Sequence, residues 1–190
     1  MNVTPELDAR FREAALAEGL VDVRYDVVDS PVGELFVAAT ERGLCRISYT
    51  PERAEEEVGR TFGRRLLRLP LDDVRRELDE YFEGGRRTFD LPLDLRVAAF
   101  QTDVLRQLAL VPYGSTITYG VLAAEAGYPK AARAVGTVMN RNPIPIVLPC
   151  HRVIGANGSL TGYAGGLDIK RRLLELEGAT YSSGSVPSSR

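Results

Sequence analysis

The sequence has little of what several common protein classes require. Two cysteines in 190 residues, Cys45 and Cys150, are too few for a disulfide framework or a cysteine-rich zinc site. No apolar run approaches the roughly 20 residues that a membrane-spanning helix needs, and the N-terminus lacks a signal-peptide pattern. Internal repeats and a nucleotide-binding glycine loop are missing as well. We therefore expect a protein of the reducing cytoplasm, without a membrane association.

Net charge is also low, at −2, which argues against a generic nucleic-acid-binding protein. The charge is unevenly distributed. Residues 1–96 hold 15 Arg against 21 Asp and Glu, whereas residues 97–178 hold 8 Lys and Arg against 5 Asp and Glu. This asymmetry places any phosphate-facing surface in the C-terminal half, although a similar bias is common in proteins that bind no nucleic acid.

What the sequence does contain is one concentration of reactive residues. The apolar run over residues 145–149 ends at a proline, and Cys150 and His151, the one histidine of the chain, follow directly. A cysteine attacks as a thiolate and needs a base or a positive charge nearby, and imidazole, with a pKa of about 6.5, is the usual base. A buried structural cysteine beside a chance histidine is the alternative, and adjacency alone does not decide between them.

The N-terminal half has the pattern of a small sheet-and-helix unit. Thr4 and Pro5 predict a helix that ends near Gly19 and has a packing role. Short β-branched and aromatic runs between residues 21 and 49 predict a three-stranded meander, with Cys45 as a core thiol in its last strand. Two helices are expected over residues 51–63 and 71–82, and then a strand or an extended linker over residues 88–95.

Helical patterns dominate the C-terminal half. A helix is expected from about residue 97 until Pro112 stops it. Residues 118–126 and 129–140 predict two short helices separated by Gly127, with Pro129 at the start of the second. Two such helices are typical of a helix-turn-helix, although an ordinary helical hairpin fits the same pattern.

The rest of the chain leads into and away from the cysteine. Residues 144–148 are expected to be extended and buried, because their prolines disfavour a central strand. Residues 167–177 predict the last helix, in whose final turn Glu177 meets an unfavourable helix dipole with no cation at i−3 or i−4. The Ser-rich tail from Thr180 is expected to be disordered. The expected buried stripe of the last helix is Ile169, Leu173 and Leu176.

The helix expected over residues 129–140 has an unusual outer face. Small or short residues surround the single long side chain of Arg133, and a glycine such as Gly136 inside a helix costs about 1 kcal/mol relative to alanine. Close approach of another backbone would explain the glycine. Close helix packing and approach to a DNA backbone are both consistent with this pattern.

Several motifs follow one another in the order of one known family. Together they make the chain similar to the 6-O-alkylguanine-DNA alkyltransferase (methylated-DNA–protein-cysteine methyltransferase) family, specifically from about residue 100 to 178 and more loosely from about 25 to 95. The motifs are Pro112-Tyr113-Gly114, Tyr119, Lys130-Ala131-Ala132-Arg133-Ala134-Val135-Gly136, Arg141-Asn142-Pro143, Pro149-Cys150-His151-Arg152 and Gly162-Tyr163-Ala164-Gly165-Gly166-Leu167.

The resemblance implies an α/β (α+β) fold in two domains. A helical extension over residues 1–20 would precede a small sheet-and-helix domain over residues 21–95. A mostly helical domain over residues 96–179 would contain the helix-turn-helix and the active-site cysteine, and residues 180–190 would form the tail.

The resemblance also implies a reaction. It is DNA repair by stoichiometric transfer of an alkyl group from 6-O-alkylguanine to Cys150, with 4-O-alkylthymine left open as a second substrate. Glu177 would orient His151, which takes the Cys150 proton. Tyr119 would assist the departing guanine, and Asn142 would brace the active-site turn. No metal or organic cofactor is implied.

DNA is the implied partner. The helix over residues 129–140 would enter the minor groove of double-stranded DNA, Arg133 would replace the flipped-out nucleotide, and the protein would act as a monomer. The expected DNA contacts are Ala131, Ala132, Arg133, Gly136 and Thr137. The expected substrate pocket consists of Arg152, Val153, Tyr163, Ala164 and Gly165.

The chain departs from the family pattern at three positions, where some members have Trp for Leu105, Gly for Thr137 and Ser for Ala164. Two other functions stay open. One is a non-catalytic sensor of alkylated DNA, whose relatives carry Trp in place of Cys150. The other is a Cys-His hydrolase of a small molecule, which would not need Arg133 on a helix of small residues.

Overall fold

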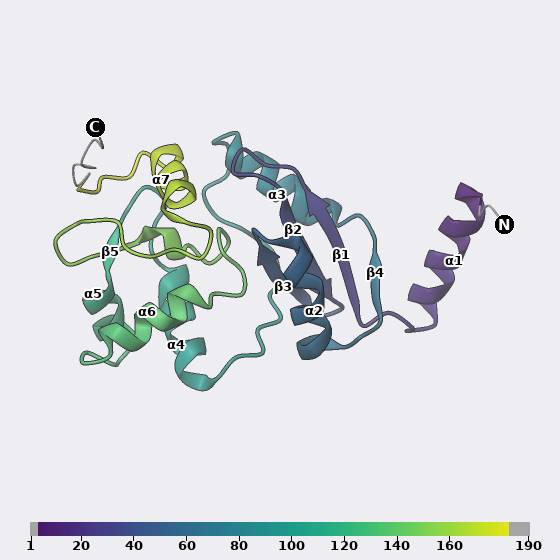
Figure 1. The fold of residues 1–190 in the computed structure, drawn as a ribbon, viewed down its shortest axis with the longest axis horizontal. Helices are drawn as coiled ribbons and strands as arrows, with labels where there is room; N and C mark the ends of the chain where they lie inside the picture. The colour runs from purple at the N-terminus through teal and green to yellow at the C-terminus, as the bar shows by residue number, and fades with distance from the viewer. Residues whose placement is uncertain (1–3, 183–190) are drawn as a thin grey trace, which may run out of the picture.

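The computed structural model describes residues 4–182 and places a mixed sheet at the centre of the N-terminal half (Figure 1). Strands β1 (Val23–Val28), β2 (Leu35–Thr40) and β3 (Gly43–Ser48) pair antiparallel in succession, so the predicted meander is confirmed. A fourth strand, β4 (Leu66–Arg68), pairs parallel to β1 and gives the order β3-β2-β1-β4. Three residues are too few to show a period-2 pattern, and this strand was not predicted.

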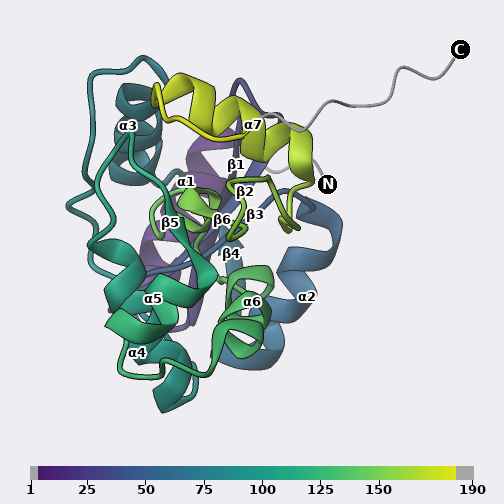
Figure 2. The same ribbon diagram turned by 90° about the vertical axis from the view of Figure 1, so that its left-hand side faces the viewer.

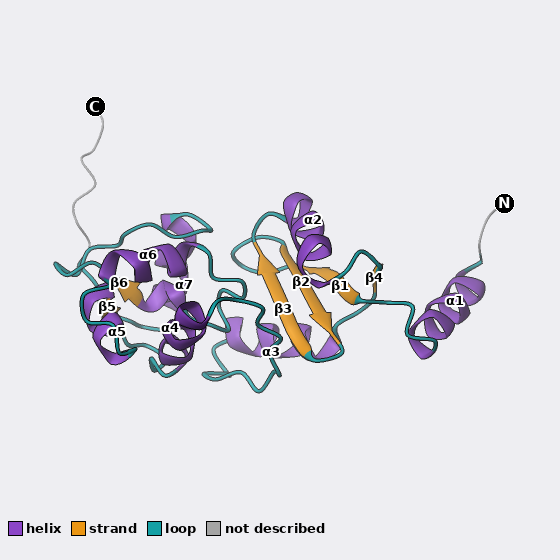
Figure 3. Ribbon diagram, turned by 90° about the horizontal axis from the view of Figure 1, so that it is seen from below, coloured by secondary structure: helices purple, strands orange, loops and turns teal. Residues whose placement is uncertain are grey.

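Helices cover both faces of this sheet (Figure 3). On one face, α2 (Pro51–Phe62) packs Ala54 and Val58 against Phe36 and Cys45. On the other, α3 (Asp72–Phe82) belongs to the larger core that the two halves of the chain share. β2 lies between these layers and is buried at every position, as expected for a strand with no solvent-facing side.

The C-terminal half is built from α4 (Ala99–Ala109), α5 (Tyr119–Glu125), α6 (Ala132–Asn140) and α7 (Leu167–Leu176), with a 3-10 turn, η1 (Cys150–Arg152). Two short parallel strands, β5 (Ile117–Thr118) and β6 (Val153–Ile154), join its segments. The predicted α5–α6 pair is present. However, α6 begins at Ala132 and not at Pro129, because the backbone first closes a turn in which Ala131 N–H donates to the Tyr128 carbonyl at 2.9 Å.

The connection between the halves is extended and lies against the sheet. Leu44 N–H donates to the Pro92 carbonyl at 2.8 Å, and Asp94 N–H donates to the Leu44 carbonyl at 2.9 Å. β3 also donates from Ile47 N–H to the Pro143 carbonyl at 2.9 Å, beside the segment that leads to Cys150. The sheet therefore fixes the position of the C-terminal half, and the two halves share one apolar core.

Both ends of the described chain differ from prediction. α1 (Pro5–Ala17) forms with Thr4 as its cap, but it stands away from the sheet, and Leu7 and Phe11 are 57% and 67% exposed (Figure 1). The predicted packing role is therefore wrong for these side chains. Ser182 N–H pairs with the Gly158 carbonyl, so residues 180–182 are held in place, while the tail prediction for residues 183–190 lies outside the described residues. No helix within residues 4–182 is long and apolar enough to cross a membrane.

Candidate active site

A tight turn delivers the cysteine. Residues 144–148 were expected to be extended, but the chain reverses there, with Leu148 N–H donating to the Ile144 carbonyl at 2.9 Å. Ile146 has a φ of 76°, and it is the one non-glycine residue with positive φ within residues 4–182. A β-branched residue adopts this conformation only where its surroundings enforce it. The local structure is thus strained just before Cys150.

Asn142 holds this turn closed. Its Nδ2 donates to the Leu148 carbonyl at 2.7 Å, and its Oδ1 accepts from Ile144 N–H at 3.1 Å. Both ends of the reversal therefore bond to one buried side chain. Hydrogen bonds of a buried amide contribute more to stability than those of an exposed one, because breaking them leaves polar groups without partners away from water.

Cys150 lies at the start of η1, unoxidised and only 2% exposed. Burial raises the pKa of its thiol to about 11, against the opposing effects of a hydrogen bond from Asn142 and the charge of Lys170. Cys150 at rest is therefore a thiol, which would have to lose a proton before it could act as a nucleophile. Within the described residues, no group of three His, Cys, Asp or Glu side chains is placed to hold a metal ion.

His151 is fully buried and bonded to Glu177. Its Nε2 lies 2.8 Å from Glu177 Oε1. Burial lowers the pKa of His151, although Glu177 acts in the opposite direction, so the imidazole is neutral at neutral pH. Because an ionised carboxylate can only accept, Nε2 carries the proton. Nδ1 has no hydrogen-bond partner among the described residues and is the nitrogen left to act as a base.

Glu177 accepts hydrogen bonds from five donors. His151 Nε2, Arg152 Nη2 and the Tyr81 hydroxyl reach Oε1 at 2.8, 2.9 and 2.8 Å. Arg152 Nε and Gly114 N–H reach Oε2 at 2.9 and 3.1 Å. Burial would raise the pKa of this carboxyl, but the bonds from His151 and Arg152 bring it below its usual range. Glu177 has no cation at i−3 or i−4 on its own helix. The cation that balances its charge is Arg152, from a distant part of the sequence.

Gly114 shows why the Pro112-Tyr113-Gly114 motif ends in glycine. Its φ is 76°, and a Cβ built there would lie 2.9 Å from the backbone oxygen of Glu177. Any other residue would be strained and would displace the end of α7. The motif therefore brings a backbone N–H onto Glu177 from the loop before β5.

Two residues of the expected pocket have buried side chains. Arg152 and Val153 are 6% and 0% exposed. Arg152 directs its guanidinium to Glu177 and to the Val111 carbonyl, which its Nη1 reaches at 2.6 Å. Val153 is in the core of the fold, on β6. Both side chains are committed to supporting interactions, and the part of these two residues in a substrate pocket stays a prediction.

Residues 162–166 form a glycine-rich loop that lies near Cys150. Tyr163 is half-buried and lowers the Cys150 pKa by a hydrogen bond to the sulfur. Its hydroxyl lies 2.7 Å from that of Tyr49, at the end of β3. Gly165 packs against the Tyr49 ring, and Ala164 is exposed. The N-terminal half thus supports this loop, a role that no pattern in its sequence indicated.

Tyr119 begins α5 and faces the same region. Its hydroxyl accepts from Thr161 Oγ1 at 3.0 Å, and burial raises its pKa, so it remains a proton donor. The ring lies opposite Gly136 of α6, where an added Cβ would be 3.9 Å away, an ordinary contact. Close packing inside the protein therefore does not account for the glycine, and this explanation from the sequence is set aside.

α6 lies beside α5, at the end of the C-terminal half that faces the viewer in Figure 2. Val135 and Met139 are buried, whereas Arg133 and Thr137 are exposed. The remaining expected contact residues are partly exposed. They are Ala131, Ala132 and Gly136.

Lys170 is a site residue that the sequence analysis missed. It is 0% exposed, and its Nζ donates to the carbonyls of Val153 at 2.6 Å and Thr161 at 3.0 Å. Burial lowers its pKa to about 8. A signal existed, because Lys170, Leu173, Leu174 and Glu177 are spaced i, i+3, i+4 and i+7. This is the buried face of α7, whereas the expected Ile169 and Leu176 are only partly buried.

Two family models match the chain. Residues 99–179 match the DNA binding domain of 6-O-methylguanine DNA methyltransferase, and residues 23–95 match its ribonuclease-like domain. The resemblance inferred from the motifs is thereby confirmed.

Individual relatives agree. A methylated-DNA–protein-cysteine methyltransferase of Methanosarcina acetivorans is 45% identical over 82% of this chain and 98% of its own length. The constitutive enzyme of Bacillus subtilis is 41% identical over 83% and 96%. Among solved structures, Mycobacterium tuberculosis OGT in complex with DNA superposes with a TM-score of 0.73 at 41% identity, covering 82% of this chain and 92% of that one. These neighbours also confirm the predicted fold class.

Proposed function

Because this chain belongs to the methylated-DNA–protein-cysteine methyltransferase family, we propose that it repairs DNA by transferring an alkyl group from 6-O-alkylguanine to its own Cys150. The observation that carries the assignment of Cys150 is the buried hydrogen-bonded pair of His151 and Glu177. His151 directly follows Cys150 in the chain, and its Nε2 lies 2.8 Å from Glu177 Oε1. Cys45, by contrast, is sealed in the sheet, where burial raises the pKa of its thiol to about 12.

The chemistry begins with a proton transfer. The Cys150 Sγ–H proton passes to His151 Nδ1, through a water molecule, while His151 Nε2–H keeps donating its hydrogen bond to Glu177 Oε1. The sulfur then attacks the alkyl carbon in line with the guanine oxygen, so that an S–C bond forms as the C–O bond breaks. Guanine departs with the electron pair, and the Tyr119 hydroxyl supplies the hydrogen bond or proton it needs. Asn142 keeps the strained turn, and so the sulfur, in place.

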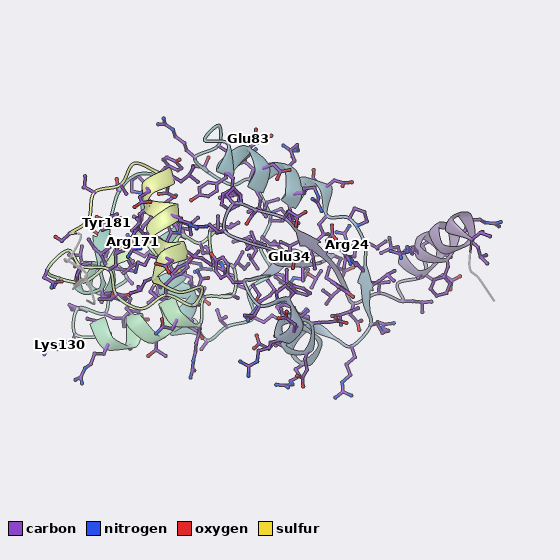
Figure 4. The ribbon with its side chains drawn as sticks, turned by 45° about the horizontal axis from the view of Figure 1, so that its top comes forward. Arg24, Glu34, Glu83, Lys130, Arg171 and Tyr181 are labelled. Atoms are coloured by element: carbon purple, nitrogen blue, oxygen red, sulfur yellow. The ribbon has the colours of Figure 1, made fainter. Side chains whose placement is uncertain are left out.

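DNA binding falls to α6. Its small-residue face allows close approach to a backbone in the minor groove, and Arg133 is exposed there to fill the space of an extruded nucleotide. Figure 4 shows Lys130 pointing outward at the end of the C-terminal half away from the sheet, where it adds positive charge before α6. We propose that the protein acts as a monomer in the cytoplasm.

Turnover provides the test. An S-alkyl cysteine has no carbonyl to accept water, so the protein should repair at most about one guanine per chain. The experiment titrates alkylated duplex oligonucleotide against protein and records product and intact protein mass. Peptide mapping should find the alkyl group on Cys150, and Cys150→Ala should abolish transfer while Cys45→Ala retains it. Many repaired guanines per chain, hydrolysis of a small-molecule ester, or DNA binding without a mass increase would each overturn the assignment.

A further inference from the structure

Tyr81, in the N-terminal half, contacts the catalytic carboxylate directly. It lies on α3, is fully buried, and donates its hydroxyl to Glu177 Oε1 at 2.8 Å. Among the hydrogen bonds that reach this carboxylate in residues 4–182, it is the one that comes from the sheet-and-helix half. The two halves therefore meet at Glu177.

Aromatic neighbours hold the Tyr81 ring in one orientation. The rings of Phe82, Phe89 and Tyr113 surround it, with centroids 5.3, 5.4 and 6.1 Å away. Burial raises the pKa of the phenol, so it stays protonated and can only donate to the carboxylate. The contact is thus a fixed hydrogen bond within a rigid cluster.

Three donors share a single oxygen. Oε1 receives the Tyr81 hydroxyl, His151 Nε2 and Arg152 Nη2, although a carboxylate oxygen offers two lone-pair directions. Each hydrogen bond reduces the negative charge that Oε1 offers to the other two donors. The Tyr81 hydroxyl must therefore weaken the hold of Glu177 on the imidazole proton.

We propose that Tyr81 is a positioning residue through which the N-terminal half controls how strongly Glu177 binds His151, and hence how basic His151 is. The inference rests on the proposed role of His151 as the base for Cys150. The titratable and charged groups around the imidazole come from three elements. They are Glu177 and Lys170 of α7 and its C-cap, Cys150 and Arg152 of η1, and Tyr81 of α3.

The test uses the fact that His151 is the one histidine of the chain. In untagged protein labelled with 15N-histidine, a single imidazole gives the NMR titration and the tautomer without assignment. Tyr81→Phe keeps the ring and removes the donor, so Glu177 stabilises the imidazolium more strongly, and His151 should titrate at higher pH. The acidic limb of the rate–pH profile for alkyl transfer should move to higher pH with it, because only neutral imidazole accepts the proton.

A second change moves the effect in the opposite direction. Replacing Tyr81 by 3,5-difluorotyrosine makes the hydroxyl a stronger donor, so His151 should titrate at lower pH. This arm carries the test if Tyr81→Phe does not fold. Tyr113→Phe is the matched control, because its hydroxyl lies in the same cluster but donates to the Leu176 carbonyl at 3.2 Å. It should leave the titration unchanged.

A folded Tyr81→Phe protein with an unchanged His151 titration would overturn the proposal and leave the tyrosine a purely structural role. So would two variants that shift the titration in the same direction. The NMR readout needs neither DNA nor alkyl transfer, so it can fail while the repair activity stands. Conversely, a protein that transfers no alkyl group would refute the proposed function without affecting the titration.

Discussion

The hydroxyl groups of Tyr49 and Tyr163 lie 2.7 Å apart and join the end of β3 to the glycine-rich loop beside Cys150. The next part of that loop rests on the same ring, because a Cβ at Gly165 would lie 2.7 Å from Tyr49 Cδ2. The position of the loop thus depends on a residue from the opposite half of the chain. The glycine is required here by a neighbouring side chain and not by a turn.

Gly165→Ala should therefore destabilise the protein by about 1–3 kcal/mol, the usual cost of inserting a methyl group into a filled site. It should also slow alkyl transfer, because the loop must shift away from Tyr49. Urea unfolding measures the first effect and single-turnover kinetics the second. In a double-mutant cycle, Tyr49→Leu should relieve part of the clash and give a coupling energy above about 0.5 kcal/mol. Gly162→Ala is the matched control, since its Cβ would meet its nearest atom, Asn140 Oδ1, at 3.7 Å.

Arg133→Ala should slow repair of duplex DNA by about tenfold to a hundredfold, because extruding a base costs a few kcal/mol that the guanidinium would no longer offset. Reaction with free alkylguanine, which needs no extrusion, should be almost unaffected. Arg106→Ala, an exposed arginine in the last turn of α4, controls for the loss of one positive charge. Equal losses on both substrates would assign Arg133 a structural role.

Gly136→Ala should separate stability from function. The added methyl group meets only the Tyr119 ring at 3.9 Å, and alanine favours a helix by up to about 1 kcal/mol over glycine. The free energy of unfolding should therefore stay constant or rise. Duplex repair should nevertheless fall, because the methyl group would stand on the helix that we propose approaches DNA. Unchanged repair in a protein of unchanged stability would remove Gly136 from the DNA interface.

Stability should fall in acid in two stages. Burial lowers the pKa of His151 in the folded protein, so its contribution is complete above about pH 6.5 and declines as the pH falls below that value. The Glu177 pKa is also lowered, so its contribution holds above about pH 4.3 and is lost at lower pH. Urea unfolding between pH 2 and 8 measures both effects.

Glu177→Gln should cost about 3–5 kcal/mol at pH 7, because it leaves the buried Arg152 guanidinium without its counterion. The difference from the unchanged protein should shrink toward low pH, where Glu177 itself becomes neutral. A Glu177→Gln protein as stable as the unchanged protein at pH 7 would contradict this account of Glu177.

The sequence by itself determined the elements and the reactive residues. Period-2 and period-3.6 patterns are local properties, so they located the meander and most of the helices, and the small residues around Arg133 already marked the outer face of α6. The adjacency of Cys150 and His151 and the ordered motifs around them identified the family. Each of these is visible in a short window of residues.

Only the tertiary structure decided which distant groups meet. Glu177 has no cation among its helical neighbours, and Arg152, Tyr81 and Gly114 N–H reach it from three other parts of the chain. The reversal at Ile146 is equally non-local, because the buried Asn142 amide enforces a conformation that the residue would not adopt alone. These groups are held in place by burial and by hydrogen bonds between polar atoms in a shared core. Both arise only when the two halves of the chain pack together.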